Sequence, residues 1–537
     1  MRKRILLKWF LLITLISGIL LPIFLSAEYT DIPVTRNLEP ERFKPCSFEE
    51  YLEKHPHQPT DFFEIAQSVN TNRENLNFLI IVEPSIYSFI QDALSTYQND
   101  LLNEELNSFL VSFSGTSEVD VKNVIVDYFN SDDIVGVILI GNLPSAWFEM
   151  YEDFNNDGIP DGDLVNFPID LFFSDLDGQW LDLDQNGLYD SHWGAVHPDI
   201  WIGRIKADNL DYSYETEIEM INDYFARNHL FRTGLLPNPN NALAYIDDDW
   251  AEWGYEYQSA LEYVYSDVEL INDINQTTAE DYRTNRLPAD YEFIQVHVHS
   301  SPAAHYFYQS NGSYYLLVHN YELPDINPTA YFYNLFACSN AHFETDNNMG
   351  SLYLLADDYC LDAIGSTKTG SMLAFEDFYE PLSLDNTMGE AFKLWWIANV
   401  DTGQNNWWAR SWFYGMVILG DPTLKIQTSL TAVDDLGDQG LEEIFFRNYP
   451  NPFSNSTTIS FNLATKSHKN TQIKIYNVKG ELVKQLSIPN SIGNNSKSSL
   501  IWDGKDENSI QMSSGIYLYK LIIDNEVIAT KKCLLLK

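Results

Sequence analysis

The segment FLIIVEPSIYSFIQDALSTYQNDLLNEELNSFLVSFSG, residues 78–115, has the pattern of a strand, a helix and a second strand. The apolar run at 78–82 has the length of a buried strand, an amphipathic stretch follows near 85–103, and FLVSFSG returns to the strand pattern. Two strands that are joined by a helix lie parallel in one sheet. The segment therefore predicts a parallel sheet covered by helices.

The same alternation continues along the chain. Further apolar runs that fit strands are VGVILIG at 135–141, ALAYIDDD at 242–249, YEFIQVHVH at 291–299, AYFYNLFAC at 330–338, LDAIGSTKTG at 361–370 and VILGDPTLKI at 417–426. We therefore expect one large α/β domain over residues 77–428, built as one or two subdomains.

The amino terminus has the features of a secretion signal. MRKR is followed by an apolar run over 5–25 and then by Ser26 and Ala27, where a signal peptidase could cut. We expect residues 1–27 to be a signal peptide, with a retained membrane anchor as the alternative. No second apolar span follows, so we expect no transmembrane span after signal removal. Residues 28–76 are polar and irregular, and their role stays open.

Charge and cysteine usage exclude several classes of protein. The 537 residues carry a formal net charge of -45, which argues against nucleic acid or an anionic membrane as a partner and favours cations and basic peptides. The cysteines are too few and too scattered for a fold built on disulfides or for a thiolate metal site. They are Cys46, Cys338, Cys360 and Cys533.

The last part of the chain differs in composition. After a linker at 429–444 (TAVDDLGDQGLEE and its flanks), residues 445–537 hold 12 basic and 6 acidic residues, a net charge of +6 against -51 for the remainder. Their runs TTISFNL, QIKIYNV and GIYLYKLII alternate apolar and polar residues between turn signals. This pattern predicts a small antiparallel, Ig-like β-sandwich.

Five sequence words in this last part point to a known family. They are NYPNPF at 448–453, IYNVKGELVK at 475–484, WDGKDEN at 502–508, SSGIYLYKL at 513–521 and the basic end KKCLLLK. The segment resembles the C-terminal sorting domain of the type IX secretion system of Bacteroidota. The resemblance implies contact with the type IX machinery, export across the outer membrane, and removal of the domain with release or surface attachment. The alternative is an ordinary Ig-like binding module.

Two reactive side chains stand at the ends of expected strands. YEFIQVHVH ends at His299, and AYFYNLFAC ends at Cys338. In an open parallel sheet, ligands bind beyond the carboxyl ends of the strands. If the two strands are neighbours, the imidazole can draw the thiol towards its thiolate and can protonate a leaving amine. The plainer interpretation is a core cysteine and a surface histidine, but the polar GSTKTG at the end of the next strand favours a site.

The words VHVHSS and LFACSNAHF carry a second resemblance, to the gingipain and caspase-like cysteine peptidases. The likeness extends through ILIGNLP at 138–144, SDLDGQW at 174–180, DIWIGRI at 199–205 and ILGDPTLKI at 418–426. It implies a caspase-like fold that hydrolyses protein or peptide substrates through a thioester on Cys338. The resemblance implies that His299 is the general acid and base. It also implies that Asp248, or its neighbour Asp249, falls near the family position of the acidic residue that can orient the histidine.

The chain departs from that family at one position. The glycine that usually follows the histidine is Ser300 here. The resemblance implies an oxyanion hole made by the backbone N–H groups of Ser300 and Cys338, and a serine still supplies that N–H. Its side chain puts the tight backbone approach in doubt. The family preference for a basic residue before the cleaved bond does not carry over.

Two segments share a spacing that suits a hard cation. DFNNDGIPD starts at 153 and DLDQNGLYD starts at 182, each with oxygen side chains at positions 1, 3, 5 and 9 and glycine at position 6. We expect structural calcium there, with further ligands from elsewhere because position 12 has no glutamate; solvated turns without metal are the alternative. The predicted ligands are Asp153, Asn155, Asp157, Asp161, Asp182, Asp184, Asn186 and Asp190.

Three functions remain open on the sequence alone. The first is a secreted or surface cysteine endopeptidase without an organic cofactor. The second is a caspase-like surface protein that has lost turnover and acts as a binding or adhesion module, which Ser300 and the aromatic share of 14% motivate. The third is a metal hydrolase, for which the candidate ligands are His297, His299, His305 and His342.

Overall fold

The structure is a computed structural model of the whole chain and divides into two compact units, Met1–Thr431 and Ala432–Lys537. In the first unit it describes residues 44–55, 63–69, 75–113, 117–155, 157–307, 316–356, 358–400 and 407–426. In the second unit it describes 446–449, 456–461, 471–477, 482–487, 498–507, 511–513, 515–523 and 526–535. The expected signal peptide at 1–27 and the expected linker at 429–444 lie outside these ranges.

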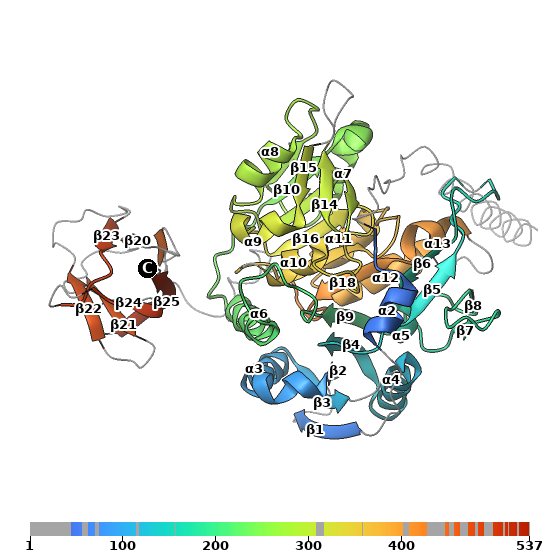
Figure 1. Cartoon of the computed structure of the whole chain (residues 1–537), viewed down its shortest axis with the longest axis horizontal. Helices are drawn as coiled ribbons and strands as arrows, with labels where there is room; N and C mark the ends of the chain where they lie inside the picture. The colour runs from blue at the N-terminus through green and yellow to red at the C-terminus, as the bar shows by residue number, and fades with distance from the viewer. Residues whose placement is uncertain are drawn as a thin grey trace, which may run out of the picture. The chain divides into compact units, whose positions relative to one another are not determined.

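One large sheet organises the first unit (Figure 1). Its described residues form eleven strands, most of which pair in parallel with a neighbour, as β2 does with β3 and β4. In sheet order the strands are β1 (Phe63–Val69), β3 (Leu106–Phe113), β2 (Leu76–Val82), β4 (Ile134–Ile140), β9 (Trp201–Ile205), β18 (Met416–Gly420), β17 (Asp362–Ser366), β16 (Phe332–Phe336), β12 (Phe293–His297), β10 (Ala242–Ile246) and β11 (Val268–Ile271).

Two strand pairings depart from the parallel pattern that the sequence predicts. β18 pairs antiparallel with β17, and β1 pairs antiparallel with β3. The strand–helix alternation could not reveal these directions, because a run such as MVILG in β18 is buried along its whole length whichever way it runs. β1 also extends the sheet upstream of residue 77, into a segment whose composition gave no sign of a strand.

Alternate residues of the strands pack against helices on opposite faces of the sheet. On β2, Phe78 and Ile80 join the apolar cluster under α3 (Pro84–Asn103), whereas Leu79 and Ile81 join the cluster under α4 (Glu118–Asp132). Figure 1 draws α3 and α4 on opposite sides of this strand. The period of two along each strand therefore makes the sheet the middle of three layers.

The remaining helices divide between the same two faces. α6 (Glu217–Arg232) and α10 (Met349–Leu355) join the cluster of α3. The cluster of α4 also holds α5 (Leu171–Ser174), α7 (Gly254–Leu261), α11 (Glu376–Ser383), α12 (Met388–Val400) and α13 (Trp407–Phe413). Trp395, Trp396 and Trp412 are fully buried there. Much of the aromatic content therefore serves the core.

Smaller elements project from the sheet. Between β4 and β9 the chain forms two hairpins, and each carries one of the Asp-rich segments: β5 (Trp147–Met150) with β6 (Val165–Pro168), and β7 (Gln179–Leu181) with β8 (Ser191–Trp193). After β12, a three-stranded antiparallel sheet consists of β13 (His299–Ser301), β14 (Ala304–Phe307) and β15 (Leu316–His319). Among the described residues, none of the helices is long and apolar enough to cross a bilayer.

A short helix lies upstream of the sheet. α2 (Phe48–Lys54) starts with a capping box, in which the Ser47 hydroxyl accepts the Glu50 N–H and the Glu50 carboxylate accepts the Ser47 N–H over 2.8 Å. Tyr51 is its buried residue. The sequence assigned no role to this segment.

The second unit is entirely antiparallel in its described strands. One sheet joins β19 (Phe446–Tyr449), β20 (Thr457–Phe461) and β23 (Ser498–Trp502); the other joins β22 (Leu482–Ser487), β21 (Thr471–Asn477), β24 (Gly515–Ile523) and β25 (Glu526–Leu535). Trp502 is fully buried in a cluster that draws residues from both sheets. The antiparallel sheets agree with the alternating sequence pattern, whereas the Ig-like topology stays a prediction.

Candidate active site

The ends of β12 and β16 bring His299 and Cys338 to one edge of the sheet. The two strands are parallel neighbours whose last pair is His297 with Phe336, and the Val298 N–H donates to the Phe336 carbonyl over 3.1 Å. His299 and Cys338 each follow that pair by two residues. Because neighbouring strands lie only about 4.8 Å apart, the chain segments that carry the imidazole and the thiol leave the sheet side by side.

Both strands end two residues earlier than the apolar runs suggested. The sequence placed the strand ends at His299 and Cys338, whereas β12 ends at His297 and β16 ends at Phe336. His299 instead begins β13 and pairs with Tyr306 of β14. An apolar run reports burial rather than pairing, and the chain stays buried for several residues after each strand has ended.

An aspartate next to β10 binds the imidazole. The Nε2 atom of His299 lies 2.8 Å from Oδ2 of Asp249, in the 3-10 helix η2 (Asp248–Trp253). The indole of Trp250 packs against the imidazole with ring centroids 4.8 Å apart. His299 is 3% exposed and Asp249 is 42% exposed on its side chain, so the pair meets solvent from the aspartate side. The carboxylate can therefore orient the ring.

The neighbouring aspartate, the first choice from the sequence, has a different environment. Among the described contacts it is Asp249, and not Asp248, that reaches His299. Burial and the charge of Asp249 raise the pKa of Asp248 to about 6. The resemblance stated above pointed to this acidic turn, and in the structure the contact to His299 comes from the second of its two aspartates.

Ser300 lies in β13 and is fully buried. Its backbone pairs with His305 of β14, and its hydroxyl donates to the Ser301 carbonyl over 2.9 Å. The serine side chain at the position of the usual glycine therefore forms a local hydrogen bond with the backbone.

A sharp turn follows Cys338, whose side chain is fully buried. Ser339 has φ of +50°, a left-handed conformation that costs a non-glycine residue roughly 1–3 kcal/mol. Two hydrogen bonds to the end of β17 hold the turn: the Ser339 N–H donates to the Lys368 carbonyl over 2.9 Å, and the Ala341 N–H donates to the Ser366 carbonyl over 3.1 Å. The neighbouring strand thus fixes the backbone that carries the thiol.

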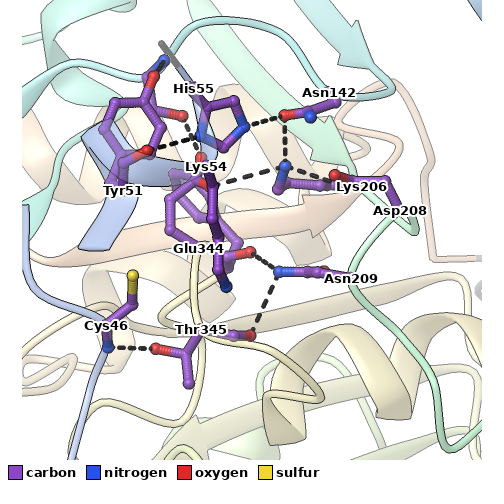
Figure 2. A network of polar contacts seen from close by, with 12 residues as sticks. Cys46, Tyr51, Lys54, His55, Asn142, Lys206, Asp208, Asn209, Glu344 and Thr345 are labelled. Carbon is purple, nitrogen blue, oxygen red and sulfur yellow. Dashed lines mark hydrogen bonds and ion pairs between the residues drawn. The ribbon is translucent and has the colours of Figure 1, made fainter.

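The loop after this turn meets the N-terminal segment 44–55 (Figure 2). The Cys46 N–H donates to the Thr345 hydroxyl over 2.8 Å, although these residues are 299 positions apart in the chain. Lys54 forms an ion pair with Asp346 at 2.6 Å. Sequence reasoning missed this segment because its contacts are with residues far away in the chain.

Beside α2 lies a group of charges in which Lys206 and Glu344 are buried (Figure 2). Lys206, which follows β9, lies 2.8 Å from Asp208 and 3.6 Å from Glu344. Its ammonium also donates to the Asn142 side-chain oxygen over 2.6 Å, and His55 Nε2 reaches the same oxygen at 2.9 Å. Burial opposes the charge of Lys206, but Glu344 and Asp208 keep its pKa above the usual value. The loops after β4, β9 and β16 therefore meet at one edge.

Three other histidines belong to the core. His297 is stacked between Tyr257 and Phe336 at centroid distances of 4.2 and 4.3 Å, and burial lowers its pKa well below the usual value. Burial also lowers the pKa of His305 and of His342 to about 3. In the described part of the chain, the groups of three or more side chains close enough to share a metal ion contain carboxylates only. The ligand set of the metal-hydrolase alternative is therefore not assembled there.

The two Asp-rich loops fold alike. In each loop the first aspartate accepts the glycine N–H over 2.9 Å, Gly158 to Asp153 and Gly187 to Asp182. The two glycines have φ of +80° and +93°, which only glycine adopts readily. In each loop the N–H of the ninth residue donates to the carbonyl of the residue before the first aspartate. The distances are 2.8 Å from Asp161 to Glu152 and 3.0 Å from Asp190 to Leu181. Equal spacing in the sequence has thus produced equal backbone geometry.

The second loop gains a carboxylate from outside. Glu149 of β5 has an oxygen within 4.8 Å of carboxylate oxygens of Asp184 and Asp190, and it accepts the Asn186 side-chain amide over 2.8 Å. These side chains could hold a hard cation with an oxygen ligand that the loop itself lacks. The sequence did not point to Glu149, because that residue precedes the loop by a whole hairpin.

Sequence comparison identifies the end of the chain. Residues 447–535 match the family described as "Secretion system C-terminal sorting domain". The chain carries a type IX sorting domain. This domain implies interaction with the type IX machinery and export to the cell surface or the medium. No curated protein matches the chain in sequence.

Solved structures give weaker likenesses. A structure entitled "Structure of Protease" covers 86% of this chain and 97% of its own, with 13% identity and a TM-score of 0.45. Dimeric latent PorU from Porphyromonas gingivalis covers 18% of this chain and 10% of its own, with 20% identity and a TM-score of 0.16. FlgD from Pseudomonas aeruginosa covers 15% and 60%, with 26% identity and a TM-score of 0.13. At these TM-scores the likenesses carry no argument about mechanism.

Proposed function

We propose that the chain is an exported cysteine peptidase in which Cys338 is the nucleophile, His299 is the general acid and base, and Asp249 orients His299. The observation that carries the proposal is the equivalent position of His299 and Cys338 beyond paired parallel strands, together with the 2.8 Å contact between His299 and Asp249. Such an arrangement of thiol, imidazole and carboxylate suits acyl transfer.

The proposed reaction has two steps. The thiolate of Cys338 attacks the carbonyl carbon of the peptide bond, His299 donates its proton to the leaving amine, and the C–N bond breaks to leave a thioester. A water molecule then gives a proton to His299 and attacks the thioester, which releases the carboxylic acid and restores the Cys338 thiolate and the protonated His299. The N–H groups of Cys338 and Ser300 are the proposed donors to the oxyanion.

The test is cleavage of a mixed peptide library, followed by mass spectrometry. The purified chain, with its N-terminal segment 44–55 retained, is compared with Cys338→Ala. Cys360→Ala is the matched control, because Cys360 is also fully buried but directs its thiol to the Asp362 carbonyl at the other end of β17. We expect cleavage to disappear only in Cys338→Ala. Cleavage that persists in that variant would exclude the thiol mechanism.

A binding role is the second candidate, and the burial of the pair favours it. Cys338 is fully buried and His299 is 3% exposed, so a substrate needs a movement of the surrounding loops to reach the thiol. The same library experiment separates the two functions. Absence of cleavage by the wild-type chain, together with slow alkylation of Cys338, would support a protein that binds a partner without turnover.

We infer further that the loops at 153–161 and 182–190 bind calcium for structural purposes. Their equal folds and the approach of Glu149 to the second loop support this assignment. Terbium luminescence excited through nearby tryptophans is the test, with Asp153→Asn and Asp182→Asn as single-site variants. We expect each variant to lose part of the signal and Glu149→Gln to weaken only the second site. No terbium signal from the wild type would refute the inference.

A further inference from the structure

Lys368, in the loop that follows β17, is a buried lysine whose backbone is bonded to Ser339, the residue after the proposed nucleophile. Only 3% of Lys368 is exposed. Its ammonium lies 2.6 Å from the Glu152 carboxylate and also donates to the carbonyl groups of Thr369 and Ser411. These three acceptors match the three N–H bonds of an ammonium group, so the side chain has one strongly determined position.

The backbone of the same residue holds the turn after Cys338. The Lys368 carbonyl accepts the Ser339 N–H over 2.9 Å, at the residue whose φ is +50°. This conformation persists only where the surroundings hold it. A shift of the Lys368 backbone would release Ser339 and turn both the thiol and the backbone N–H of Cys338.

Glu152 ties this arrangement to the first Asp-rich loop. It directly precedes Asp153, the first residue of that loop, and its carbonyl accepts the Asp161 N–H over 2.8 Å. The Asp153 N–H donates to the Ser411 hydroxyl over 2.7 Å, and the Ser411 carbonyl is one of the acceptors of the Lys368 ammonium. The backbone that carries the Glu152 side chain is thus bonded to the Asp-rich loop at one point and to Ser411 at another.

A buried ion pair is weak evidence for stability, because apolar residues of similar volume often serve the core as well. The presence of the Lys368–Glu152 ion pair is better explained by the backbone geometry that it specifies. We propose that Lys368 is a positioning residue of the peptidase: with its ammonium fixed by Glu152, its carbonyl sets the turn that aims the Cys338 thiol and N–H. This inference rests on the proposed peptidase function.

The experiment measures kcat, KM and the rate of Cys338 alkylation by iodoacetamide in the full chain. The variants are Lys368→Met, Glu152→Gln and the double variant, which leaves neither charge unpaired and so keeps a folded form available. A displacement of about 1 Å at a reacting group can cost about a hundredfold in rate. We expect kcat to fall at least about tenfold with KM within about twofold, and we expect the effect of the double variant to be less than the product of the single effects.

Arg232→Met is the matched control. Arg232 is buried and pairs with Asp421 at 2.7 Å, near the amino end of β17 and away from Cys338. We expect this variant to lower the melting temperature as much as Lys368→Met does while kcat and the alkylation rate stay unchanged. An equal loss of kcat in both variants would reduce Lys368 to a general stabilising role and would overturn the proposal.

The remaining outcomes separate this proposal from the one on which it rests. If the wild-type chain cleaves peptides and the double variant cleaves them equally fast, the positioning role is wrong and the peptidase stands. If the wild-type chain cleaves nothing, the peptidase proposal fails and the positioning role fails with it.

Discussion

The contact between His299 and Asp249 distinguishes two neighbouring aspartates whose roles could not be told apart from the sequence. In a 3-10 helix successive side chains point about 120° apart, so one residue of η2 can face the imidazole while its neighbour faces away. The presence of β12 and β16 and the polar residues that follow them could be predicted from residue types, although both strands end two residues earlier than predicted. The choice between Asp248 and Asp249 depends on the backbone angles of a single turn, which no residue type encodes.

We predict that Asp249→Asn lowers kcat of the proposed peptidase at least about tenfold. The amide cannot stabilise the imidazolium, and it can hold the ring in the wrong tautomer. Steady-state kinetics on a peptide chosen from the library is the measurement, with Asp248→Asn as the adjacent control that keeps its kcat within about threefold. Equal effects of the two substitutions would argue against a specific role for Asp249.

Glu292, just before β12, gives a prediction about pH. The side chain is fully buried, and burial raises its pKa to about 8, whereas an unfolded chain has a glutamate pKa of about 4.3. Below pH 4.3 both states hold the proton. Between about pH 4.3 and 8 the folded state must bind a proton that the unfolded state lacks, so the carboxyl group costs progressively more stability as the pH rises.

We therefore expect Glu292→Gln to have a free energy of unfolding that is larger than that of the wild type at pH 8, by on the order of a few kcal/mol, and so a higher unfolding temperature. At pH 4.5 we expect the two proteins to differ little. Thermal unfolding at the two pH values is the measurement. Glu262→Gln, at an exposed position after α7, is the control that should change neither value. A stabilisation that is the same at both pH values would contradict the assignment.

Among the elements, the apolar runs predicted most strands of the large sheet, and the amphipathic pattern predicted the helix α3. β9, the hairpins and α2 were not predicted. α2 has seven residues and a clear capping box, but a helix of that length depends on the surface on which it docks. The flanking residues Cys46 and His55 are bonded to Thr345 and Asn142, in the loops after β16 and β4, and a local pattern cannot report such contacts.

We predict that Tyr51→Ala destabilises the first unit by about 3 kcal/mol, because it empties a buried aromatic site and leaves the Ser145 N–H without its 3.1 Å acceptor, the Tyr51 hydroxyl. Thermal or urea unfolding measures the loss. Tyr255→Ala, on the exposed face of α7 where the ring is 73% exposed, is the matched control with little expected change. An unchanged stability of Tyr51→Ala would mean that α2 is not docked in solution.

At the scale of the whole molecule, the chain joins a strongly acidic first unit to an end segment, residues 445–537, with a net charge of +6. The sequence separated them because composition, charge and the sorting-domain words all change near the same place. It also predicted a mainly parallel α/β unit. It could not give the directions of β1 and β18 or the attachment of residues 44–55, because these depend on pairings between distant parts of the chain.

We predict that residues 432–537, placed behind a fluorescent protein with a signal peptide, direct that protein to the surface or the medium of a bacterium with a type IX system. The control fusion ends at residue 525 and lacks β25, whose removal uncovers the whole edge of β24. Whole-cell fluorescence and the culture supernatant give the readout. Retention of the full fusion inside the cell would show that this unit is insufficient for export.

The docking of α2 on the loop after Cys338 has a consequence for the order of folding. The Cys46–Thr345 hydrogen bond spans 299 residues, so α2 is synthesised long before its docking surface exists. A chain that emerges amino terminus first must keep Tyr51 and its neighbours unsatisfied until the sheet has formed as far as β16, and contacts of such long range slow folding. We therefore expect closure of the first unit by α2 to be a late kinetic event, visible as a slow phase that Tyr51→Ala removes.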